Sequence, residues 1–68
     1  MFTKTEIELI ESLRNADPII KSAKVSCIKL SAIRIRVTGE KEKECFCSQV
    51  RRRIWIKDFY TWYDSITK

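Results

Sequence analysis

Three cysteines and no histidine limit the metal chemistry that this chain can support. Cys45 and Cys47 lie two residues apart, and Cys27 lies well before them. Structural zinc sites use four cysteine or histidine ligands, often with C-x-x-C spacing, and this chain supplies neither the number nor the spacing. If Cys45 and Cys47 lie on a strand, their Cα atoms are about 6.5–7 Å apart, which disfavours a bond between them. We expect no metal site and thiols that act as small apolar side chains.

Enzymatic chemistry is poorly supported as well. A cysteine or serine nucleophile usually needs a positioned base, and without histidine only carboxylates and lysines remain. Their spacing indicates no site. A glycine-rich cradle for nucleotide phosphates cannot form, because Gly39 is the only glycine. We therefore expect a protein that is not an enzyme, with no cofactor and no small-molecule substrate.

The basic residues suggest contact with phosphate groups, to which arginine donates paired hydrogen bonds. The net charge is +5, and from Pro18 to Gly39 there are five basic residues and no acid. A surface of this kind can bind nucleic acid through its phosphates without reading the sequence. The leading prediction is therefore a small basic non-catalytic module that contacts nucleic acid through Lys29, Arg34, Arg36, Arg51, Arg52 and Arg53.

Aromatic residues support an alternative function. Five of the seven lie between Trp55 and Tyr63, directly behind the arginine triplet. Trp, Tyr and Arg dominate the energetics of protein–protein interfaces. The alternative is a structural or interaction protein that self-associates or joins a larger assembly, for example a viral particle component, a viral or mobile-element accessory protein, or a protein inhibitor. Its interface would use Trp55, Tyr60, Trp62 and Tyr63, although aromatic residues at helical spacing are more typical of a core.

A long C-terminal helix is needed to position these residues. At about 100° per residue, Trp55, Phe59 and Trp62 fall on one apolar side, with polar residues opposite. Ser48 is the expected N-cap. The arginine triplet then lies in the first turn, where the helix dipole disfavours cations. Either a bound anion compensates, or a preceding strand continues to about Arg53 and the helix starts later.

The N-terminal third also predicts a helix. Thr3 and Glu6 have the spacing of a capping box, and we prefer this pair to Thr5 and Glu8, which lacks a hydrophobic staple. Asn15 and Pro18 mark the end of the helix. Residues 18–30 fit a second helix opened by Asp17, but Val25 and its neighbours are poor helix formers. We expect a short helical turn over 18–23 and a strand afterwards.

Residues 32–38, AIRIRVT, form the clearest predicted strand, because apolar and cationic side chains alternate. Gly39 and the EKEKE run predict a turn, and residues 45–47 a returning strand. Pairing Ile35 with Phe46 buries the phenyl ring, whereas pairing Ile35 with Cys45 exposes it; we expect Phe46 inside. The predicted fold is a single α+β domain over residues 1–68: an N-terminal helix, an antiparallel β-hairpin or three-stranded sheet, and a long amphipathic C-terminal helix rich in aromatic residues.

Length and hydropathy suggest the setting in which the chain works. Sixty-eight residues make a domain that buries about 60% of its unfolded surface, so a partner chain would help to stabilise it. No apolar run approaches the roughly 18 residues of a membrane span, and the N-terminus lacks the features of a signal peptide. An odd number of cysteines fits a reducing compartment. We expect no membrane association and a cytoplasmic location, or a place within an intracellularly assembled particle.

Overall fold

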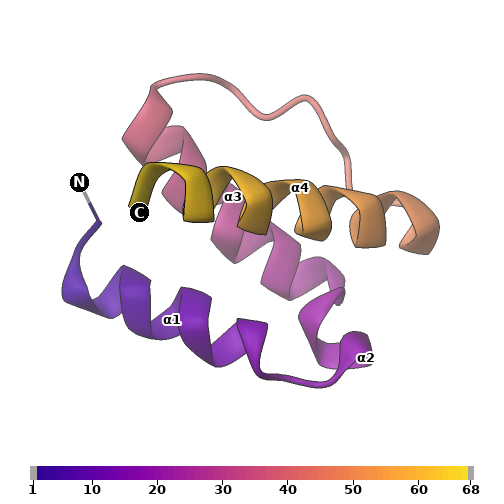
Figure 1. Cartoon of the computed structure of the whole chain (residues 1–68). Helices are drawn as coiled ribbons and strands as arrows, with labels where there is room; N and C mark the ends of the chain where they lie inside the picture. The colour runs from indigo at the N-terminus through magenta and orange to yellow at the C-terminus, as the bar shows by residue number, and fades with distance from the viewer. Residues whose placement is uncertain (1, 68) are drawn as a thin grey trace.

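The computed structural model describes residues 2–67, which fold as four α-helices joined by short segments and one longer loop. The helices are α1 (Lys4–Arg14), α2 (Pro18–Lys21), α3 (Lys24–Thr38) and α4 (Gln49–Thr67). Helix α3 packs on each of the other three, and the loop from 39 to 48 returns from the end of α3 to the start of α4 (Figure 1). No strand occurs within residues 2–67, so the prediction of an α+β fold with a β-hairpin is wrong.

Helix α1 begins and ends where the sequence predicts, and α2 begins at its predicted residue but ends at Lys21, before the predicted Ala23. The Thr3 hydroxyl accepts from the Glu6 N–H at 3.1 Å, and the Glu6 carboxylate accepts from the Thr3 N–H at 2.9 Å, which completes the capping box. Asn15 caps the C-terminus of α1. The Asp17 carboxylate accepts from the Ile19 and Ile20 N–H groups, with Pro18 at the first position of α2. Side-chain hydrogen bonds therefore confirm all three local predictions.

The strands predicted after 25 and over 32–38 both belong to α3. Cys27, Leu30 and Ile33 face the core at helical spacing, and Val37 follows one turn after Ile33. Ile35 lies on the opposite, solvent-facing side, so two separate apolar faces of one helix produce the alternation that resembles a strand. The lower helix propensity of β-branched residues costs only tenths of a kcal/mol each, about a fifth of the gain from burying one such side chain.

Helix α4 starts at its predicted cap. The Ser48 carbonyl accepts from the Arg52 N–H at 2.9 Å, and its hydroxyl accepts from the Arg51 N–H at 3.4 Å. The alternative in which a strand continues to Arg53 is therefore wrong. The helix buries one face, formed by Trp55, Ile56, Phe59, Tyr60 and Tyr63. Within residues 2–67, no helix has the length and apolarity needed to cross a bilayer.

Phe59 lies at the centre of the aromatic core and is fully buried. Its ring stacks on Trp55 at 5.4 Å between centroids and meets Tyr60 edge-on at the same distance. Phe46 reaches the same core from the loop and meets Trp55 edge-on at 5.0 Å. The expectation that Phe46 is buried is confirmed, but the predicted return strand over 45–47 is wrong, because Phe46 lies in a loop with φ 60°.

Candidate functional site

The cations predicted to share one strand face point in different directions on α3. The Arg34 guanidinium contacts the Asp58 carboxylate at 3.3 Å and lies over the Trp62 ring, 5.1 Å from its centroid. Arg36 instead holds Glu6 of α1 through two hydrogen bonds, the one from Nε at 2.7 Å. Lys29 is exposed. The helix therefore separates Arg34 from Arg36, and each contributes to contacts between helices.

The three arginines at the start of α4 have three different environments. Arg51 pairs with Glu44 at 3.2 Å. Arg52 donates from Nε to the Ser22 carbonyl at 2.9 Å and from Nη1 to the Phe46 carbonyl at 2.7 Å. Arg53 is exposed, and its side chain makes no hydrogen bond or ion pair within the described chain. Of the triplet, Arg52 joins the α2–α3 junction to the loop before α4, whereas Arg53 projects into solvent.

The aromatic residues predicted for a protein interface lie mostly in the core. Trp55, Tyr60 and Tyr63 are buried, and Trp62 is half-buried beneath Arg34. The Tyr60 hydroxyl donates to the Ile10 carbonyl at 2.8 Å, and burial raises the pKa of Tyr60 to about 12. These contacts assign the aromatic face of α4 to packing against the other helices.

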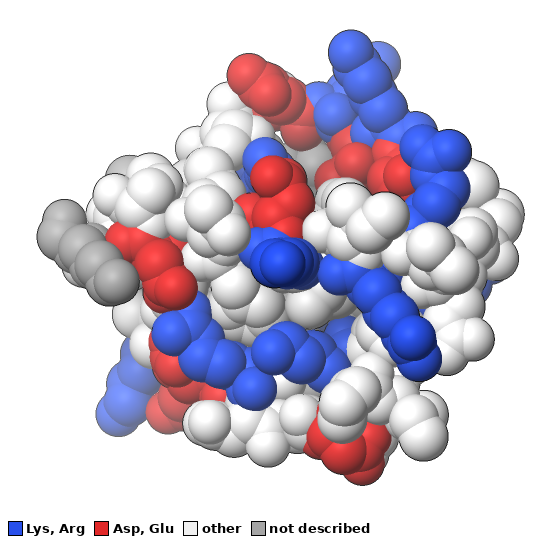
Figure 2. Space-filling model, turned by 45° about the vertical axis from the view of Figure 1, so that its right-hand side comes forward, with Lys and Arg blue, Asp and Glu red and all other residues white. Residues whose placement is uncertain are grey.

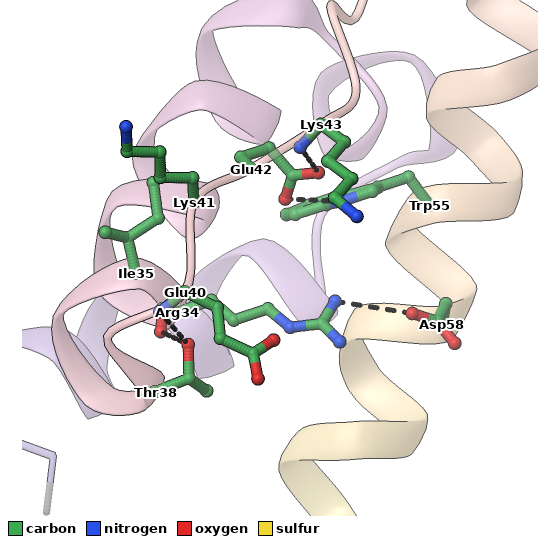
Figure 3. Close-up of a pocket in the computed structure, with 9 residues that line it drawn as sticks. All are labelled: Arg34, Ile35, Thr38, Glu40, Lys41, Glu42, Lys43, Trp55 and Asp58. Carbon is green, nitrogen blue, oxygen red and sulfur yellow. Dashed lines mark hydrogen bonds and ion pairs between the residues drawn. The ribbon is translucent and has the colours of Figure 1, made fainter.

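A hollow of about 310 Å³ lies between the end of α3, the loop and α4 (Figure 3). Arg34 and Asp58 form an ion pair across one side, and Glu42 accepts from the Trp55 indole N–H at 3.0 Å on the other. Its lining contains cations and acids in equal number: Arg34, Lys41 and Lys43 with Glu40, Glu42 and Asp58. The balance of charge gives this hollow no preference for an anion such as phosphate.

The solvent-facing side of α3 carries an apolar stripe that the sequence analysis missed. We define the α3 stripe as Val25, Ile28, Ala32 and Ile35, which are spaced by 3, 4 and 3 residues. At about 100° per residue they fall within roughly 80° of arc. Val25 is 62% exposed and Ile28 50% exposed. The signal was present in the sequence, because this is the spacing of an a/d seam, but the strand interpretation obscured it.

Cations border the α3 stripe on both sides. By the same helical geometry Lys24 lies along one edge, and Arg36 and Lys29 lie along the other. No acid occurs on α3 itself. Elsewhere the surface is mixed: Figure 2 shows Lys and Arg side chains across the middle of one face with Asp and Glu among them. Glu6 of α1 already pairs with Arg36, so Lys24 on one edge and Lys29 on the other are the exposed cations that the stripe offers to a partner.

The Glu6–Arg36 pair gives a testable dependence on pH. Hydrogen bonds from Arg36 and from the Thr3 backbone lower the pKa of Glu6 from 4.5 to about 2. A carboxyl group whose pKa is depressed in the folded state stabilises the fold at pH values above its unfolded-state pKa. That stabilisation is lost as the pH falls from about 4.5 to about 2. We expect Glu6→Gln, which can keep the capping box, to reduce this loss of thermal stability on acidification.

Glu8→Gln is the matched control, because Glu8 is an exposed residue of the same helix. Thermal melts followed by circular dichroism at neutral and acidic pH make the comparison. Equal acid sensitivity in Glu6→Gln and the unmodified chain would contradict a role for the Arg36 pair.

Comparison with protein-family models, curated proteins and solved structures gives no match for this chain. No group of three or more cysteine, aspartate, glutamate or histidine side chains is placed to hold a metal ion within residues 2–67. Function therefore has to be inferred from this chain's own surface, of which the α3 stripe with its cationic borders is the most distinctive part.

Proposed function

We propose that this chain is a non-catalytic protein-binding module, and that the α3 stripe docks an amphipathic helix of a partner with acidic residues beside its apolar seam. The observation that carries this proposal is the combination of an exposed a/d-spaced apolar stripe with cations along both of its edges. The apolar side chains supply the driving force, and the bordering cations select the charge of the partner.

The geometry of the α3 stripe favours a helical partner. Spacing of 3, 4 and 3 residues keeps an apolar seam on one side over three turns, which is the pattern that a second helix can pack against. Complete burial of a Val or Ile side chain is worth roughly 1.5–3 kcal/mol, and about half of that remains to be gained where the side chain is already half-buried. Three such residues supply enough driving force for weak to moderate docking after the cost of association is subtracted.

A second copy of this chain fits the α3 stripe poorly. Two α3 helices packed face to face would bring the Lys24 and Lys29 edges of both copies together, which is unfavourable for like charges. Helix α1 carries more acid, but its exposed side is largely polar and offers no matching apolar seam. Self-association therefore becomes an outcome that the binding experiment must detect.

Nucleic acid is the second candidate, favoured by the absence of acid on α3 and by the exposed cation Arg53. Phosphate contacts need exposed cations at the surface, and Lys24, Lys29 and Arg53 satisfy this condition. The apolar centre of the exposed α3 side argues against it, because Ile28 and Val25 offer nothing to a phosphate backbone. An oligonucleotide probe separates the two candidates.

The test uses a synthetic helical peptide with leucine at a and d and glutamate at e and g, labelled for fluorescence anisotropy. We expect it to bind, more weakly at high salt, whereas the same peptide with lysine at e and g does not. Val25→Asp should weaken binding at least tenfold, about 1.4 kcal/mol, because a charge would face the apolar seam.

Val50→Asp is the matched control. Val50 is also the second residue of its helix and is 66% exposed, but it lies on the outer side of α4, away from α3. Equal weakening by both variants, equal binding of both peptides, or no peptide binding would overturn the proposal. Salt-dependent binding of an oligonucleotide without peptide binding would favour the nucleic-acid alternative, and a dimer in light scattering that Val25→Asp dissociates would favour self-association.

A further inference from the structure

The loop before α4 brings two exposed thiols to one bend. Cys45 and Cys47 flank Phe46, whose φ of 60° places it in the left-handed region that side chains other than glycine rarely adopt. The Cys47 thiol lies 3.7 Å from the Cys45 carbonyl oxygen. On an extended strand the two Cα atoms would be about 6.5–7 Å apart, near or beyond the limit for a disulfide. The positive φ of Phe46 shows that the chain is not an extended strand here, and the two thiols are close enough to share a hydrogen bond.

The rest of the protein holds this bend in place. The Phe46 ring is buried against Trp55, and the Phe46 carbonyl accepts a hydrogen bond from Arg52. Arg52 also donates to the carbonyl of Ser22, the C-cap of α2. A sparsely populated backbone conformation costs roughly 1–3 kcal/mol and persists only where surrounding contacts impose it. The ring and the carbonyl of Phe46 therefore anchor the bend, and the exposed thiols extend from the residues on either side of it.

The surroundings of the thiols favour reaction at Cys45. The neighbouring Cys47 thiol lowers the pKa of Cys45, and Cys45 raises the pKa of Cys47, as expected when one thiolate is stabilised by a hydrogen bond from the other. Lys24 adds positive charge near Cys47, and Glu44 adds negative charge near both thiols, which raises the pKa of each. Cys27 differs, because it is fully buried and burial raises its pKa. An exposed thiol with thiolate character is the type that enters disulfide exchange.

We propose that Cys45 and Cys47 form a redox-active dithiol that closes to an intramolecular disulfide by exchange with a small-molecule disulfide. The Cys45 thiolate attacks one sulfur of the small disulfide, forming a mixed disulfide and releasing one equivalent of small thiolate. Cys47, after losing its proton, attacks the Cys45 sulfur and releases the second equivalent. The two protein thiols are thereby oxidised by two electrons, and the small disulfide is reduced to two thiols.

The experiment equilibrates the whole protein with glutathione and glutathione disulfide, quenches with acid and maps the cysteines by mass spectrometry. We expect oxidation to give the Cys45–Cys47 disulfide without bound glutathione, and Cys27→Ser to behave in the same way. Cys47→Ser should instead accumulate a glutathione adduct on Cys45, because the second step is missing. Folded protein should favour closure by at least about tenfold over the same chain in urea.

Three outcomes would overturn the proposal. The first is a stable glutathione adduct on both Cys45 and Cys47, and the second is that both thiols stay reduced in excess glutathione disulfide. The third is that the disulfide closes as favourably in urea as in the folded protein. The Cys27→Ser variant tests whether Cys27 takes part in the exchange, because it removes the third thiol of the chain and leaves the residues of the bend unchanged. The proposal does not depend on the α3 stripe, so Val25→Asp should close its disulfide as the unmodified chain does.

Discussion

Phe46→Ala is expected to lower the free energy of unfolding by about 3–5 kcal/mol, because the substitution removes a buried ring and leaves a cavity beside Trp55. A chain of 68 residues is held by only about 3–10 kcal/mol in total, so a large part of this variant should be unfolded at room temperature. Urea unfolding followed by tryptophan fluorescence measures the loss, and Trp55 at the site makes the signal sensitive.

A comparison with glycine separates the lost ring from the backbone conformation. At φ 60° alanine pays roughly 1–2 kcal/mol that glycine does not, so Phe46→Gly should be at least as stable as Phe46→Ala. Phe59 provides the opposite case, because it lies inside α4. The Phe59→Gly variant should be less stable than the Phe59→Ala variant by about 1 kcal/mol. If the alanine variant were more stable than the glycine variant at both positions, a left-handed conformation at Phe46 would be contradicted.

The starts of α1, α2 and α4 were predictable because their signals are local. The Thr3–Glu6 box, Asp17 before Pro18, and Ser48 each act within three residues, so short-range chemistry decides them. Local signals did not decide whether residues 24–38 form a helix or a strand. A helix with apolar residues on two faces shows neither a single stripe nor a polar side, and the choice between helix and strand then depends on which residues the rest of the chain buries.

The predicted phosphate contacts show a second limit of sequence reasoning. Composition locates cations along the chain but does not reveal which acids or carbonyls meet them after folding. Arg36 meets Glu6 across thirty positions, and Arg52 meets Ser22 across the same separation. The thiols illustrate the converse, because the left-handed Phe46 between them arises from tertiary anchors that no periodic pattern encodes. Contacts between distant segments therefore decide which charged and reactive groups remain available at the surface.

Arg52→Gln is expected to cost about 2–4 kcal/mol, because two charge-assisted hydrogen bonds to the Ser22 and Phe46 carbonyls are lost together. The neighbouring arginines provide controls of the same residue type. Arg51→Gln removes an exposed ion pair with Glu44 and should cost at most about 1 kcal/mol, and Arg53→Gln should change stability by less than about 0.5 kcal/mol. Urea midpoints of the three variants, compared at equal slope, measure the differences.

Equal effects of the three substitutions would contradict a structural role for Arg52.

The difference between the structural Arg52 and its exposed neighbours also decides how electrostatic binding should be tested. Replacing the whole triplet would weaken any ligand's binding simply by unfolding the bend, whereas Arg51→Gln with Arg53→Gln removes two surface charges and leaves both Arg52 hydrogen bonds intact. A loss of oligonucleotide affinity in that double variant, with a smaller salt dependence, would reflect phosphate contacts and not a damaged fold.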